Sequence, residues 1–119
     1  MVTNFESITP NITDQELAII PFLINGFVMH GKSNPIKAPE IVRQMNVFLV
    51  AHGYKIKMTE PRLRRCANYI RSNSMLPLIA TSEGYFVSED RMEIERQIKS
   101  LYERASAIKS CADGLKAFI

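Results

Sequence analysis

The stretch MTEPRLRRCANYIRSN, residues 58–73, carries four arginines and a narrow apolar stripe at helical spacing. Thr59 is a good helix cap, and Pro61 lies in the first turn, where no backbone hydrogen bond is lost. We therefore predict a helix at residues 59–72. Successive side chains of a helix are rotated by about 100° around its axis, which places Arg65 and Asn68 farthest from the apolar face. That face consists of Leu63, Cys66, Ala67 and Ile70.

The positive charge of the chain is concentrated around this helix. Residues 55–71 contain one acidic side chain, Glu60, and six basic ones, a net charge of +5: Lys55, Lys57, Arg62, Arg64, Arg65 and Arg71. The remaining residues contain nine basic and eleven acidic side chains, a net charge of −2. Like charges three or four residues apart destabilise a helix, so the cluster favours an anionic partner over a simple solvated face.

Two further helices are predicted before this one. Thr13-Asp14-Gln15-Glu16 matches a capping box, in which the threonine hydroxyl and the glutamate carboxylate each bind a backbone amide. Apolar residues then recur at helical spacing, at Leu17, Ile20, Ile24, Phe27 and Val28. Residues 35–37 are expected to be extended because prolines disfavour helical geometry in the residues before them. A second helix begins near Pro39 and ends at residues 52–54, with an apolar face of Ile41, Met45, Phe48 and Leu49.

The pattern changes after residue 74. Residues 76–80 and 85–87 are β-prone runs on either side of a glycine-containing turn, which predicts a hairpin. A last helix is expected to begin near residues 88–90, whose acidic side chains suit a helix amino terminus. Apolar residues along it repeat at alternating spacings of four and three over about three heptads: Ile94, Ile98, Leu101, Ala105, Ile108, Ala112 and Leu115.

This order of elements predicts a mainly α protein with a small β-hairpin, namely a winged helix-turn-helix followed by a long carboxy-terminal helix. We expect a polar lead-in at residues 1–12 and a winged-helix DNA-binding domain at residues 13–87. Residues 88–119 are expected to form an amphipathic helix for self-association.

A narrower resemblance rests on YIRSNSMLPLIATSEGYFVS followed by EIERQIKSLYERASAIKSCADGL. This combination of a basic helix, a strand, a short turn, a GY(Y/F) strand and a long helix resembles small winged-helix DNA-binding proteins of bacteria, their phages and mobile elements. The resemblance covers roughly residues 36–115. It implies a recognition helix at residues 59–72 and a wing at residues 76–87. It also implies a role in transcription regulation or in a phage or mobile-element DNA transaction.

Double-stranded DNA is therefore the expected partner. Arginine can pair with guanine and asparagine with adenine in the major groove, so Arg62, Arg65 and Asn68 are the predicted base contacts. Basic and hydroxyl side chains around them are the predicted phosphate contacts: Lys55, Lys57, Thr59, Arg64, Arg71 and Ser82. Tyr85 is expected to be structural, pairing across the hairpin.

The heptad pattern has two interpretations. It favours a homodimer held by a short coiled coil, because the outward positions of the helix carry charges of both signs. Alternatively, the same apolar stripe packs on the chain's own first helix.

Catalytic chemistry has little support in the sequence. His30 and His52 are isolated, no pair of cysteines or histidines has metal-ligand spacing, and no glycine-rich loop offers a phosphate cradle. We expect a binding protein that is not an enzyme and has no cofactor or metal. The alternative function is a winged-helix protein–protein interaction module without direct DNA binding, whose basic helix meets an acidic protein.

Two observations predict a cytoplasmic protein with no membrane segment. Cys66 and Cys111 lie 45 residues apart with no CxxC pairing, which favours reduced thiols. The longest apolar run, residues 18–29, is too short to span a bilayer.

Overall fold

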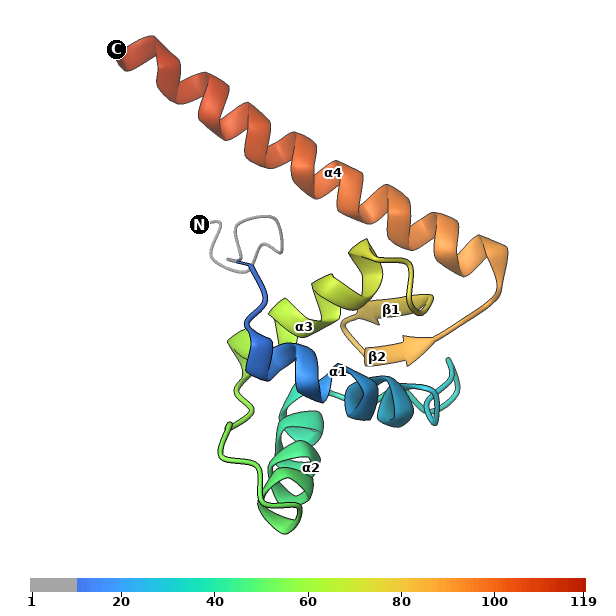
Figure 1. The fold of residues 1–119 in the computed structure, drawn as a ribbon. Coiled ribbons are helices and arrows are strands. Elements are labelled where there is room, and N and C mark those ends of the chain that lie inside the picture. The colour runs from blue at the N-terminus through green and yellow to red at the C-terminus, as the bar shows by residue number, and fades with distance from the viewer. Residues whose placement is uncertain (1–10) are drawn as a thin grey trace.

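The computed structural model describes residues 11–119, so most of the predicted lead-in, residues 1–12, lies outside the described part. The chain is mainly helical with one two-stranded antiparallel hairpin (Figure 1). The elements follow in the order α1 (Asp14–Phe27), α2 (Ala38–Ala51), α3 (Glu60–Ser72), β1 (Leu78–Thr81), β2 (Gly84–Val87), α4 (Arg91–Leu115) and the short 3-10 helix η2 (Lys116–Phe118). This confirms the predicted order of helices and hairpin.

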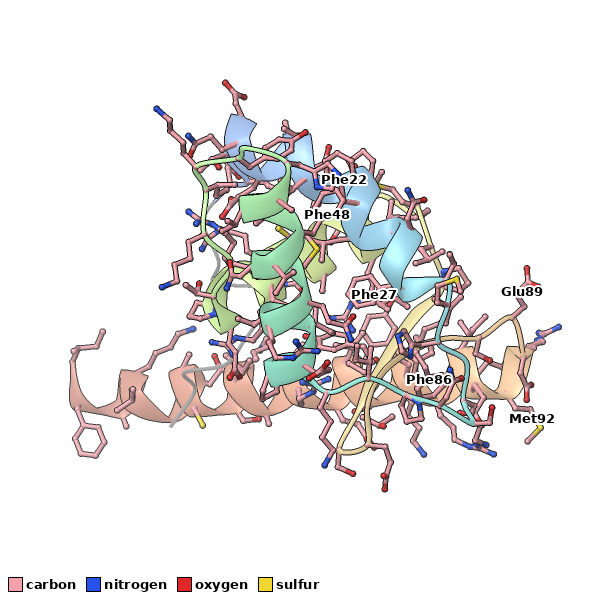
Figure 2. The ribbon with its side chains drawn as sticks, turned by 90° about the horizontal axis from the view of Figure 1, so that it is seen from below. Phe22, Phe27, Phe48, Phe86, Glu89 and Met92 are labelled. Atoms are coloured by element: carbon pink, nitrogen blue, oxygen red, sulfur yellow. The ribbon has the colours of Figure 1, made fainter. Side chains whose placement is uncertain are left out.

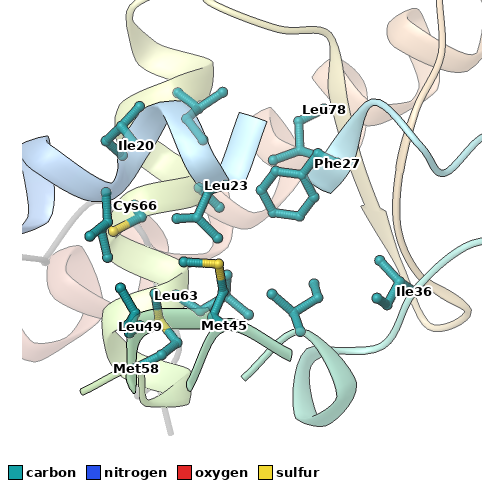
Figure 3. Packing of buried hydrophobic residues seen from close by; sticks show 14 residues of the cluster. Ile20, Leu23, Phe27, Ile36, Met45, Leu49, Met58, Leu63, Cys66 and Leu78 are labelled. Atoms are coloured by element: carbon teal, nitrogen blue, oxygen red, sulfur yellow. The ribbon is translucent and has the colours of Figure 1, made fainter. Parts of the chain in front are cut away.

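The main core lies where α1, α2 and α3 converge (Figure 3). The predicted inner face of α3 is confirmed, because Leu63, Cys66, Ala67 and Ile70 all have no exposed surface. The buried face of α1 was predicted less well. Leu17 and Val28 are exposed, and the buried positions are Glu16, Ile19, Ile20, Leu23 and Phe27. Nearly every position of this run is apolar, so its periodicity alone does not define the inner face.

A small sheet lies between the helical core and α4 (Figure 1). Besides the β1–β2 pairing, Ile36 exchanges two backbone hydrogen bonds with Tyr85, with N···O distances of 2.9 and 2.8 Å. The predicted extended segment at residues 35–37 thus forms a third, very short edge. Gly84 permits this approach, because its φ is +123° and an added Cβ would lie 2.5 Å from the Ile36 carbonyl oxygen.

Each face of the hairpin has its own neighbour. On the core side, the Tyr85 ring lies 5.6 Å from the ring of Phe27 in α1, which supports a structural role for Tyr85. Successive strand residues point to opposite faces, so the paired residues Ile79 and Phe86 lie together on the other side. Both residues are buried on the face of the hairpin that lies next to α4. The hairpin is therefore held on an edge and on both faces.

The link between α2 and α3 is fixed by specific contacts. Gly53 has a positive φ of 76°, and Tyr54 N donates to Leu49 O at 2.9 Å, which closes α2 in the manner of a Schellman motif. Asn46 then holds the backbone of Met58 on both sides, accepting from its N–H at 2.8 Å and donating to its carbonyl at 3.1 Å. Although this link is longer than a tight turn, it sets the direction in which α3 begins.

Helix α4 begins at its cap Asp90, as predicted, and extends well beyond the rest of the protein (Figure 1). Its first turns are anchored by Gln97, whose side-chain oxygen accepts from Ala80 N in β1 at 2.7 Å. Glu93, on the same face, pairs with Lys32 and Arg96. Every residue from 109 onward is exposed. Within residues 11–119, no helix has the length and apolar character needed to cross a membrane.

Candidate nucleic-acid interface

The predicted DNA-binding residues lie along α3 and the link before it, but three of the cations are occupied by contacts within the chain. The decisive contact involves Glu16 in the first turn of α1. The Glu16 side chain is completely buried, and Arg62 and Arg65 both extend from α3 to contact it. The sequence pattern around Glu16 indicates only its role in the capping box.

The geometry of this triad is well defined. Glu16 Oε2 accepts from Arg62 Nε at 2.8 Å and from Arg65 Nη2 at 2.7 Å. Its Oε1 accepts from Arg65 Nε at 3.1 Å and from the Thr13 amide at 3.0 Å, which also confirms the predicted capping box. A buried carboxylate is costly unless it is paired, and here both oxygens are satisfied.

The triad corrects the predicted orientation of Arg65. We expected Arg65 and Asn68 to project farthest from the core. Instead, the Arg65 side chain is only 20% exposed and that of Arg62 only 26%. The reason is that α1 lies along this side of α3 and supplies a buried anion. Each guanidinium uses two of its five N–H groups in its hydrogen bonds to the described residues, so three N–H groups on each remain available.

The environment of Glu16 also fixes its charge. Burial raises the pKa of this carboxyl, but hydrogen bonds from Arg65, the Thr13 amide and Arg62 outweigh burial and lower the pKa to about 2. The carboxylate is therefore ionised at neutral pH. Nearby, burial and the negative charge of Glu16 raise the pKa of the Cys66 thiol to about 12, so this thiol remains protonated and unreactive.

Asn68 and Arg71 belong to a second internal network. Arg71 donates to Asn68 Oδ1 at 3.1 Å and to Gln97 Oε1 of α4 at 3.2 Å. The amide nitrogen of Asn68 is buried and has no hydrogen-bond partner among the described residues. The prediction that Asn68 is a fully outward side chain is therefore wrong, and Arg71 joins α3 to α4. Sequence periodicity could not identify the contact with Gln97, because that residue lies 26 residues along the chain from Arg71.

The other predicted contacts are more accessible. Lys55 and Lys57 are exposed on the link, and Arg64 is half-buried on the flank of α3. Within residues 11–119, these three cations make no ion pair. The Thr59 hydroxyl accepts from Arg62 N at 3.3 Å as the helix cap, so its first role is structural. Ser82 is exposed in the two-residue turn of the hairpin, beside a surface hollow that it shares with Ser100 of α4.

The surface around the start of α3 remains strongly positive after these pairings. Against the five cations Lys55, Lys57, Arg62, Arg64 and Arg65 stand two anions, Glu60 and the buried Glu16, which leaves a net charge of +3. Because one carboxylate is shared by two guanidiniums, the triad itself keeps one positive charge. This basic surface, defined as Lys55, Lys57, Arg62, Arg64 and Arg65, is the candidate interface.

The predicted seam of α4 divides into two parts. Ile94, Ile98 and Leu101 border a groove shared with residues 76–79, so this part faces the chain's own hairpin region and not α1. Farther along, Ala105, Ala112 and Leu115 are exposed and Ile108 is half-buried. Among the described residues, the apolar stripe of α4 therefore does not pack on the first helix, as the alternative interpretation expected.

No metal centre accompanies these sites in the part of the chain that the structure describes, where no three His, Cys, Asp or Glu side chains gather closely enough to bind an ion. Comparisons of the chain with protein-family models, with curated proteins and with solved structures found no match.

The Glu16 triad makes stability depend on pH in a defined window. The lowered pKa means that the folded state holds the Glu16 carboxylate more favourably than the unfolded chain does. Stability from this group is complete above pH 4.5 and is lost as the pH falls toward 2. We expect Glu16→Gln to lower the free energy of unfolding by about 3 kcal/mol at pH 7 and to flatten its decline between these pH values. Urea unfolding of both proteins across this range measures the difference, and parallel pH profiles would contradict it.

Proposed function

We propose that this protein binds duplex DNA as a winged helix-turn-helix protein, with the basic surface at the start of α3 against the phosphate backbone. The order of three helices and a hairpin, with the cationic helix directly before the hairpin, supports the winged-helix assignment. The short strand pairing of Ile36 with β2 is compatible with it. The biological role that we propose is transcription regulation or a DNA transaction of a phage or mobile element, as the sequence resemblance implies.

The observation that carries the proposal is the net charge of +3 that the basic surface retains after Glu60 and the buried Glu16 are counted against its five cations. Neutralising phosphates with lysine and arginine releases counterions, and this supplies most of the affinity of non-specific DNA binding. Lys55 and Lys57 are exposed on the link, and Arg64 lies on the following helix. These residues are the first candidates for phosphate contact.

Arg62 and Arg65 have a different proposed role. Glu16 holds both guanidiniums in fixed orientations, and a fixed planar fork loses less side-chain entropy when it binds phosphate or guanine. We therefore keep both as DNA contacts and assign Glu16 as the residue that positions them. Asn68 and Arg71 are weaker candidates because each would first have to leave its internal network.

Self-association through α4 is part of the proposal. The apolar positions beyond the hairpin contact, Ala105, Ile108, Ala112 and Leu115, continue the heptad register on a helix that projects from the domain. Two such helices side by side would bury this stripe and present two basic surfaces to one duplex. Dimerisation would then increase the number of phosphates contacted.

A second function is favoured by the internal pairing of Arg62, Arg65 and Arg71, which reduces the number of free cations. Under it, the protein is an interaction module that binds an acidic protein through the same surface. The DNA experiment separates the two functions directly.

Replacing Lys55 and Lys57 together by alanine is expected to weaken duplex binding and to make it less dependent on salt. If both lysines neutralise phosphates, the slope of log affinity against log salt falls by about 1.8. Fluorescence anisotropy with a labelled duplex over a range of salt concentrations measures this. The matched control replaces Arg91 and Lys99 of α4, both exposed, and removes the same charge. No binding by the wild-type protein at low salt, or equal loss in both variants, would contradict DNA binding through this surface.

Replacing Ile108 and Leu115 by serine is expected to convert a dimer into a monomer, because both positions belong to the seam beyond the hairpin contact. Sedimentation velocity distinguishes the dimer from the 13.5 kDa single chain. Ala107→Ser, on another face of the same helix, should leave the dimer intact. A wild-type protein that sediments as a monomer at concentrations of tens of micromolar would refute the dimer without affecting the DNA proposal.

A further inference from the structure

A half-open cavity lies between α1 and α2, on elements that the proposed DNA surface does not use. It has a volume of about 320 Å³ and its walls are mainly apolar. Small-molecule sites in proteins span roughly 300 to 1,000 Å³ and combine apolar walls with a few polar groups. Leu23, Phe27, Ile36 and Met45 are among the lining residues, and their positions are labelled in Figure 3.

Aromatic side chains form much of the lining. Phe22 and Phe48 meet across the two helices with ring centroids 4.8 Å apart, and Phe27 lines the same cavity farther along α1 (Figure 2). Flat rings at tilted angles favour contact with another flat ring, because edges and faces of aromatic groups attract each other. The lining therefore suits an aromatic guest.

Gly26 lies on the wall of the cavity, at an exposed position of α1. A Cβ added there would meet nothing within 4 Å, so close packing within the chain does not require glycine at this position. Glycine inside a helix is less favourable than alanine by up to about 1 kcal/mol. The position thus provides space that neighbouring side chains do not fill.

Three polar side chains line the cavity, Asn25, His30 and Gln44, and His30 and Gln44 each present a hydrogen-bond acceptor. His30 Nδ1 lies 2.8 Å from the Asn34 carbonyl oxygen, and because a carbonyl only accepts, this nitrogen carries the hydrogen. The Nε2 of a neutral His30 is then an acceptor. Gln44 donates its amide to Glu40 at 2.9 Å, which leaves its Oε1 as a second acceptor. Both residues line the cavity.

We infer that this cavity binds a small, neutral aromatic molecule that carries an N–H or O–H donor, of the size of an indole or a phenol. The rings and aliphatic side chains take the apolar body of the molecule, and His30 or Gln44 accepts from its donor. This site is independent of the basic surface and of DNA binding.

The test uses the full chain with indole as the probe and 1-methylindole, which lacks the donor, as its matched control. Two-dimensional ¹H–¹⁵N spectra should show saturable shifts at Gly26, Phe27 and Phe48 with indole. Binding of 1-methylindole should be about five-fold weaker, the effect of one lost hydrogen bond. Gly26→Leu should abolish the shifts, because its side chain fills the cavity, and Gln44→Met combined with His30→Phe, which removes both acceptors, should weaken indole alone.

Unfolding midpoints of the two variants establish that they fold. A failure of Gly26→Leu to fold leaves the wild-type titration and the variant without both acceptors as the deciding measurements. The inference is overturned if indole gives no saturable shifts up to its solubility limit, or if Gly26→Leu folds and binds indole as the wild type does. Equal affinities for the two indoles would overturn the acceptor assignment and with it the proposed ligand class.

Discussion

The buried carboxylate of Glu16 is the constraint on which the arrangement of this protein depends. A carboxylate without solvent must be paired, and the two arginines that pair it come from a helix 46 and 49 residues farther along the chain. The contact therefore fixes the amino-terminal turn of α1 against the first half of α3. It also fixes the rotation of α3 about its own axis. The apolar stripe alone would allow a range of rotations in this arginine-rich helix.

That orientation has a direct consequence for the surface. Arg62 and Arg65 turn toward α1 and Arg71 turns toward α4. Among the six cations at residues 55–71, this leaves Lys55, Lys57 and Arg64 without an ion pair to the described residues. The positive field is thus centred on the start of α3 and the link before it, where Asn46 holds the backbone. A proposed DNA surface built on fixed backbone and fixed guanidiniums is preorganised, which lowers the entropic cost of binding.

Local patterns in the sequence predicted the elements well. The caps at Thr13 and Thr59, the inner face of α3 and the hairpin around Gly84 each depend on residues close together in the chain, where spacing and turn chemistry suffice. The failures involve contacts between distant residues. The prediction that Arg65 points outward was based on helical geometry alone. No residue near it in the sequence indicated that the first helix supplies an anion.

Glu16 illustrates why such contacts escape prediction. Its capping role explained the residue completely at the level of sequence, so a second role had no separate signal. The early part of the α4 stripe is similar, because an apolar heptad pattern looks the same whether it faces a second copy or the chain's own hairpin. The only signal in the sequence was the excess of arginine. Clustered like charges repel each other, and an anion within the chain can compensate them as well as an external partner can.

A double-mutant cycle between Glu16 and Arg65 tests the central claim most directly. The free energies of unfolding in urea at pH 7 are measured for the wild type, Glu16→Gln, Arg65→Gln and the double variant. If the carboxylate and the guanidinium hold α1 against α3, the two substitutions are non-additive by about 1 to 3 kcal/mol. Additivity to within about 0.5 kcal/mol would contradict the account, because it would mean that the two groups do not act on each other in the folded protein.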